Sequence, residues 1–185
     1  QGIDCIVVDH HQPPDLGGAV HPAAAHLNPR AWEGDAPDLV ALRMLSASGL
    51  AFCLCAELAR DLQVEQWDRA AGLVLAGLGT VADVVPLTGL NRVLVQAALH
   101  HANDPRFLEA RLPGLAKLHE LSGGGAVDAR TFGYRWGPRV NASGRIESAR
   151  EPAELLLAAD PERIGVLATA CHATNEDRKD RTARM

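Results

Sequence analysis

The chain has 185 residues, of which 47% are hydrophobic and only 4% aromatic, and its formal net charge at pH 7 is −5. This length suits one ordinary domain or slightly more, and a core of Ala, Val and Leu favours helices packed on a sheet over an aromatic-rich β-sandwich. The charge argues against a protein coated in basic surface, and because the sequence has no signal peptide and no apolar run long enough to span a membrane, we expect a cytoplasmic protein without membrane contact.

The first predicted element is an apolar run over residues 3–8 that ends in Asp9-His10-His11. Such a run predicts a buried parallel strand, and open α/β sheets bind ligands at the carboxyl ends of these strands. A carboxylate beside imidazoles suits Mn²⁺, Mg²⁺ or Zn²⁺. Successive side chains of an extended chain point to opposite sides, so one histidine could hold metal while the other faces substrate. The alternative is that Asp9 caps a turn and the histidines lie on a surface loop.

A loop rich in proline and glycine follows over residues 12–18, and a second short strand is predicted over 24–27, ending at Asn28-Pro29-Arg30. Beyond it, apolar residues at helical spacing predict a series of helices. They cover residues 38–62, 67–78, 91–101, 115–121, 129–134, 151–159 and 163–185. In the first of these helices Asp38 would be the N-cap, and Gly49 would either break the helix or allow close packing.

Asp83 lies between these helices, among Val, Ala and Leu residues. An unpaired ionised carboxylate is costly in such surroundings, and a bound metal would remove the cost. Asp83 is therefore the natural partner of Asp9-His10-His11. The alternative is an aspartate that only caps a helix or a turn.

The basic residues are distributed unevenly. Residues 1–129 carry eight Lys/Arg against fifteen Asp/Glu, whereas residues 130–185 carry ten against eight. A predicted loop over 137–145 contains Arg139, Asn141 and Arg145, and guanidinium groups match phosphate oxygens bidentately. This loop therefore suits a phosphate ester or an anionic polymer, or else it is structural and its arginines pair with carboxylates.

Taken together, these motifs resemble the RecJ family of single-strand-specific exonucleases, within the DHH phosphoesterase superfamily. The resemblance rests on residues 6–11, 27–30, 79–87 with Asn91-Arg92, and 137–145, in this order. It implies an α/β fold in which a parallel sheet is flanked by helices. Residues 1–160 would be the C-terminal portion of a DHH phosphoesterase domain truncated at its N-terminus, and residues 161–185 a connector helix towards an absent second domain.

The resemblance also implies hydrolysis of single-stranded DNA from the 5′ end, in DNA repair and recombination, with two Mn²⁺ or Mg²⁺ ions. By that resemblance His10 and Asp83 would be metal ligands, Asp9 would support the cluster, and His11 would meet the scissile phosphate. The residues along the nucleic-acid path would be Arg139, Asn141 and Arg145. Single-stranded DNA is the expected partner, and we expect a monomer.

The sequence departs from the family pattern because the amino-terminal acidic motifs, which supply further metal-binding aspartates, are absent from these residues. The chain also opens directly in a strand without an initiator Met, so we expect an internal fragment that is inactive alone and binds Mn²⁺ weakly. One alternative is a small-substrate DHH phosphodiesterase acting on oligonucleotides or cyclic dinucleotides. The other is a non-catalytic DHH-fold scaffold, which the intact Asp9, His10, His11 and Asp83 argue against.

Overall fold

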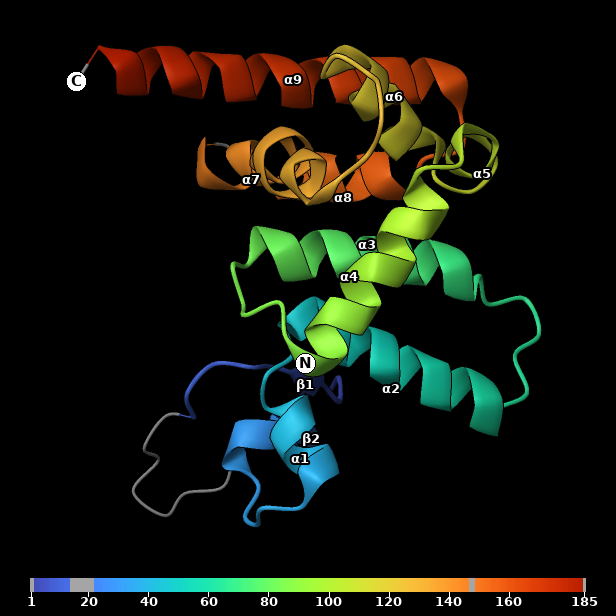
Figure 1. The fold of residues 1–185 in the computed structure, drawn as a ribbon, viewed down its shortest axis with the longest axis vertical. Helices are drawn as coiled ribbons and strands as arrows, with labels where there is room; N and C mark the ends of the chain where they lie inside the picture. The colour runs from blue at the N-terminus through green and yellow to red at the C-terminus, as the bar shows by residue number, and fades with distance from the viewer. Residues whose placement is uncertain (1, 14–21, 147–148, 185) are drawn as a thin grey trace. The chain divides into compact units, whose positions relative to one another are not determined.

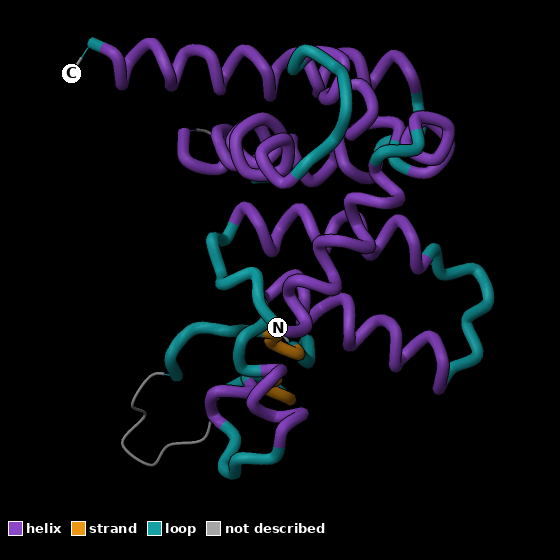
Figure 2. Tube along the Cα trace, in the orientation of Figure 1, coloured by secondary structure: helices purple, strands orange, loops and turns teal. Residues whose placement is uncertain are grey.

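A computed structural model of the chain describes residues 2–13, 22–146 and 149–184, without the side chains of 143–146 (Figure 1). Contacts divide the chain into two compact units, Gln1–Gln96 and Ala97–Met185. Both short strands belong to the first unit, and the described part of the second unit is helical apart from loops (Figure 2). The architecture is thus an α/β fold with a small parallel sheet and a long C-terminal helix.

Helices make up most of the described chain. Their bounds are α1 Pro37–Leu42, α2 Ala47–Asp61, α3 Arg69–Ala82, α4 Gly89–Ala102, α5 Pro105–Arg111, α6 Pro113–Leu121, α7 Gly137–Ile146, α8 Arg150–Leu157 and α9 Pro161–Ala183, with the short η1 Pro29–Ala31 and the π-helical η2 Thr131–Trp136. Within the described residues, none of these helices is both long and apolar enough to cross a membrane.

The sheet consists of β1, Ile6–Val8, and β2, Ala25–Leu27, which pair in parallel with Val8 opposite Leu27. The Asp9 N–H extends this pairing by donating to the Leu27 carbonyl at 3.1 Å. Helix α2 packs against β1. The prediction of a buried strand is wrong for the described chain, because Ile6 is 64% exposed. Val8, which points to the same side of the strand as Ile6, is half-buried.

The predicted helix over 38–62 is instead two helices, α1 and α2, separated by a turn. Ser46 starts α2 because its hydroxyl accepts the Gly49 N–H at 3.2 Å, and the same oxygen lies 3.1 Å from the Thr80 hydroxyl of α3. Asp38 lies in the first turn of α1, and Ala36 occupies the N-cap, so the cap predicted at Asp38 is wrong.

In the second unit, residues 137–146 form helix α7, so the loop predicted over 137–145 is wrong. Helix α7 continues directly from the π-helical η2, so Pro138 follows a stretch in which the regular α-helical hydrogen bonding is already altered. Helix α5 was not predicted. Its N-cap is Asp104 and its first residue is Pro105, so this Asp-Pro pair begins a helix.

Helix α9 packs against α6, α7 and α8 within the second unit. The residues of α9 that are buried against the other helices are Ile164, Leu167, Ala168, Cys171 and Asn175. Its role as a connector to a further domain stays a prediction.

His119 of α6 makes the stability of the second unit depend on pH. Its Nε2 lies 3.0 Å from the Gly125 carbonyl, its ring stands edge-on to Trp136, and its buried Nδ1 has no partner among the described residues. Burial lowers the pKa of His119, so the folded state favours the neutral ring.

We therefore expect the second unit to lose stability as the pH falls, because the unfolded chain takes up this proton more readily. Denaturant unfolding of the chain at about pH 7.5 and about pH 5.5 would measure the loss. In His119→Gln, which keeps a donor near Gly125, the loss should be smaller, and an equal loss in both proteins would contradict the expectation.

Candidate metal centre

Asp9 organises the turn at the end of β1. Its Oδ1 accepts the His10 N–H at 2.8 Å, the His11 N–H at 3.2 Å and the His11 ring Nδ1 at 2.7 Å. The bond from the His11 side chain is the main cause that lowers the pKa of Asp9, and the backbone N–H groups lower it further against the opposing effect of burial. An ionised carboxylate only accepts, so Nδ1 of His11 donates this bond.

The two histidines of this turn have different partners. His11 is bonded to Asp9 and its side chain is 76% exposed, whereas the His10 side chain is only 13% exposed. Their rings are tilted by 55° to each other. The ring centroids are only 4.4 Å apart, so the prediction that the two side chains point to opposite sides is wrong, because the chain turns here and is no longer extended.

Asp83 is held at the C-terminal end of α3, where its N–H donates to the Gly79 carbonyl at 2.9 Å. Gly79 allows α3 to approach α2 closely, because a Cβ on Gly79 would collide with the side chain of Ser48. The chain then leaves α3 sharply through Val84, which has a φ of +59°. That region is unfavourable for a β-branched residue, so the surrounding structure must hold this turn in place.

His10 and Asp83 meet at this point, with Nε2 and Oδ2 3.3 Å apart. A carboxylate at the C-terminal end of a helix lies at the negative end of the helix dipole, and a bound cation would relieve this repulsion. One imidazole nitrogen and one carboxylate oxygen suit Mn²⁺ and related divalent ions. Within the described residues no group of three or more His, Cys, Asp or Glu side chains could hold a metal. The pair thus fits part of a metal site.

Asn28 belongs to the same cluster, although the sequence interpretation gave it no role. It follows β2 directly, is fully buried, and its Nδ2 donates to the His11 carbonyl at 2.9 Å. The position of Asn28 in the sequence could have revealed this role, because polar residues at the ends of neighbouring parallel strands lie at one edge of the sheet.

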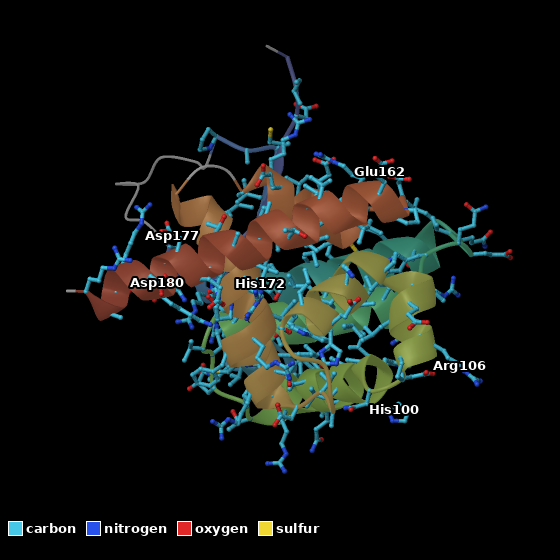
Figure 3. The ribbon with its side chains drawn as sticks, turned by 90° about the horizontal axis from the view of Figure 1, so that it is seen from above. His100, Arg106, Glu162, His172, Asp177 and Asp180 are labelled. Carbon is cyan, nitrogen blue, oxygen red and sulfur yellow. The ribbon has the colours of Figure 1, made fainter. Side chains whose placement is uncertain are left out.

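The residues predicted to bind nucleic acid belong to the second unit. The Arg139 side chain is only 7% exposed, and its guanidinium donates to His172 Nδ1 at 3.0 Å, to the Arg135 carbonyl at 2.8 Å and to Glu176 Oε1 at 3.2 Å. His172 and Glu176 both lie on α9, where Figure 3 labels His172. This position matches the structural alternative for Arg139 and does not support contact with DNA. Asn141 is exposed, and the side chain of Arg145 lies outside the described residues.

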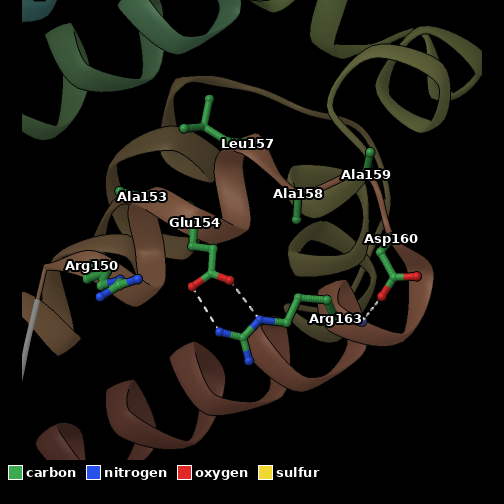
Figure 4. Close-up of a pocket in the computed structure, with 8 residues that line it drawn as sticks. All are labelled: Arg150, Ala153, Glu154, Leu157, Ala158, Ala159, Asp160 and Arg163. Atoms are coloured by element: carbon green, nitrogen blue, oxygen red, sulfur yellow. Dashed lines mark hydrogen bonds and ion pairs between the residues drawn. The ribbon is translucent and has the colours of Figure 1, made fainter.

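A hollow between α8 and the start of α9 is lined by two arginines, Arg150 and Arg163 (Figure 4). Arg163 is held there by two bonds to the Glu154 carboxylate, each 2.8 Å long. This carboxylate neutralises the Arg163 guanidinium.

No protein-family model matches the chain. Among curated proteins, the single-stranded-DNA-specific exonuclease RecJ of Dickeya dadantii is 34% identical over 196 residues, covering 100% of this chain and 32% of the relative. RecJ of Bacillus subtilis is 32% identical over 190 residues, covering 100% of this chain and 21% of the relative. The chain thus spans about a third or less of the length of these relatives.

Solved structures agree with these matches. The crystal structure of RecJ from Thermus thermophilus in complex with Mn²⁺ has a TM-score of 0.76 at 32% identity, covering 97% of this chain and 25% of that one. A crystal structure of exonuclease RecJ bound to manganese has a TM-score of 0.77 at 28% identity, covering 97% of this chain and 42% of that one. A third, also from Thermus thermophilus, contains Mg²⁺.

Proposed function

Because this chain belongs to the RecJ family by sequence and by fold, we propose that it forms part of the catalytic domain of a metal-dependent exonuclease. The substrate would be single-stranded DNA, hydrolysed from the 5′ end in repair and recombination. The observation that carries this proposal is the 3.3 Å approach of His10 Nε2 to Asp83 Oδ2, beside the bonded pair of Asp9 and His11. The Mn²⁺ and Mg²⁺ in the solved relatives support either ion as the cofactor.

In the proposed reaction, His10 and Asp83 would hold a divalent ion, and that ion would stabilise negative charge on the phosphate. His11 faces the substrate. With its Nδ1 proton bound by Asp9, its Nε2 can accept a proton from the attacking water or, once protonated, donate one to a phosphate or leaving oxygen. Asp9 fixes the ring tautomer and stabilises the protonated form.

The described residues supply only part of a two-metal site, which ordinarily uses several carboxylates. We therefore expect the 185-residue chain alone to bind Mn²⁺ weakly and to turn over no DNA. Asn141 and Arg145 remain the proposed residues of the nucleic-acid path.

The test uses the intact protein that carries this sequence, with Mn²⁺ and four substrates: long single strands labelled at either end, a duplex and a dinucleotide. We expect shortening of the long single strand from its 5′ end and resistance of the duplex. Cleavage of the dinucleotide alone would instead indicate a small-substrate phosphodiesterase. Failure to cleave any substrate, together with failure to bind Mn²⁺, would indicate a scaffold.

A further inference from the structure

Asn28 connects the ends of the two strands through one side-chain amide. Its Oδ1 accepts the Arg30 N–H at 3.0 Å and so begins η1. Its Nδ2 donates to the His11 carbonyl at 2.9 Å and lies 3.4 Å from Asp9 Oδ2. The amide therefore contacts the backbone after β2, the backbone after β1, and the carboxylate that orients His11.

The orientation of this amide follows from its partners. If Nδ2 and Oδ1 exchanged places, two acceptors would face Oδ1 and a backbone N–H would face the NH₂ group. Only the observed orientation satisfies the contacts, and a buried amide with its partners in place is a rigid anchor.

The two carboxylate oxygens of Asp9 are thereby held by different partners. Oδ1 receives the three donors of the His10-His11 turn, and Oδ2 faces Asn28. Rotation of the carboxylate would break the bond to His11 Nδ1. A group that prevents this rotation therefore fixes the direction in which His11 Nε2 points.

We propose that Asn28 is a positioning residue, which acts on the reaction through Asp9 and His11 without touching the substrate. The part of its test that measures cleavage rests on the proposed function. It also predicts a property of the chain that needs no substrate, namely the rigidity of the turn formed by residues 9–11.

The variant Asn28→Asp keeps an acceptor for the Arg30 N–H and places a carboxylate oxygen against Asp9 and the His11 carbonyl. Asn28→Ser keeps a capping hydroxyl and removes the NH₂ group, so it serves if the first variant does not fold. The matched control is Asn103→Asp. Asn103 is a structural asparagine of the second unit whose amide spans the Leu99 carbonyl and both backbone groups of Val127.

Hydrogen exchange of the chain, measured at the His10 and His11 amides, should become about tenfold faster in the Asn28 variants and remain unchanged in Asn103→Asp. In the intact protein, kcat on single-stranded DNA should fall about 10- to 100-fold in the Asn28 variants, with KM changed less than about twofold. The control should keep its kcat.

Unchanged exchange at these amides would overturn the proposal. Faster exchange with an unaltered kcat would also overturn it, because the turn would then be loosened without consequence for the reaction. A wild-type protein that cleaves no single strand would contradict the proposed function separately, while the exchange measurement would still decide whether Asn28 holds the turn.

Discussion

Replacing Asp83 with alanine in the intact protein should lower cleavage of single-stranded DNA at least about a thousandfold, equivalent to ~4 kcal/mol of transition-state stabilisation. The reason is the position of Asp83 at the end of α3, where its carboxylate meets His10 and would hold the cation. Binding of the single strand should change less than about twofold, because phosphate contacts elsewhere dominate affinity. Initial rates and equilibrium binding in the presence of Mn²⁺ would measure both effects.

The matched control is Asp35→Ala, since Asp35 is a fully exposed carboxylate of the same unit. It should retain wild-type turnover, as surface substitutions away from special features have small effects. Wild-type turnover in Asp83→Ala would remove Asp83 from the metal site, and an equal loss in both variants would show that the effect is not specific to the site.

Replacing Arg139 with glutamine should destabilise the second unit by about 2–3 kcal/mol, because it removes a buried guanidinium that links η2 and α7 to α9. Arg139→Lys should recover little of this, since an ammonium cannot reproduce the planar fork of donors. Denaturant unfolding of the chain measures the loss. Arg106→Gln is the control, because Arg106 is an exposed arginine of the same unit and its replacement should cost less than about 0.5 kcal/mol.

The salt dependence of DNA binding separates this structural role from contact with phosphate. Loss of one phosphate contact lowers the slope of log K against log salt concentration by about 0.7 for a single strand. Under conditions where the intact protein stays folded, we expect no change of slope in Arg139→Gln and a decrease of about 0.7 in Arg145→Gln. A reduced slope with unchanged stability in Arg139→Gln would contradict the structural role.

The sequence associated Asp83 with Asp9-His10-His11, and the resemblance to RecJ assigned His10 and Asp83 to one site. The premise that Asp83 is enclosed by apolar residues is wrong, because its side chain is 41% exposed at the C-terminal end of α3. The sequence could not reveal the partners of Arg139, since His172 and Glu176 lie more than one helix further along the chain. Any arginine beside glycine and asparagine suggests phosphate binding until the packing of its helix is known.

The same limitation explains the loop wrongly predicted over residues 137–145. Gly, Pro and Asn favour loops in isolation, but here residues 137–146 continue the helical run of η2 and pack along α9. The exposure of Ile6 was likewise unpredictable, because a strand's composition reveals which residues prefer burial and not which elements cover them.

The central claim is that His10 and Asp83 hold the same divalent ion, and a Mn²⁺ titration of the intact protein tests it most directly. The titration compares the wild type with His10→Ala, Asp83→Ala and the double variant. We expect each single variant to weaken Mn²⁺ binding about 10- to 100-fold, and the double variant to be little weaker than the worse single one, because both changes remove the same site. Wild-type Mn²⁺ affinity in either single variant, or fully additive losses in the double variant, would contradict the claim.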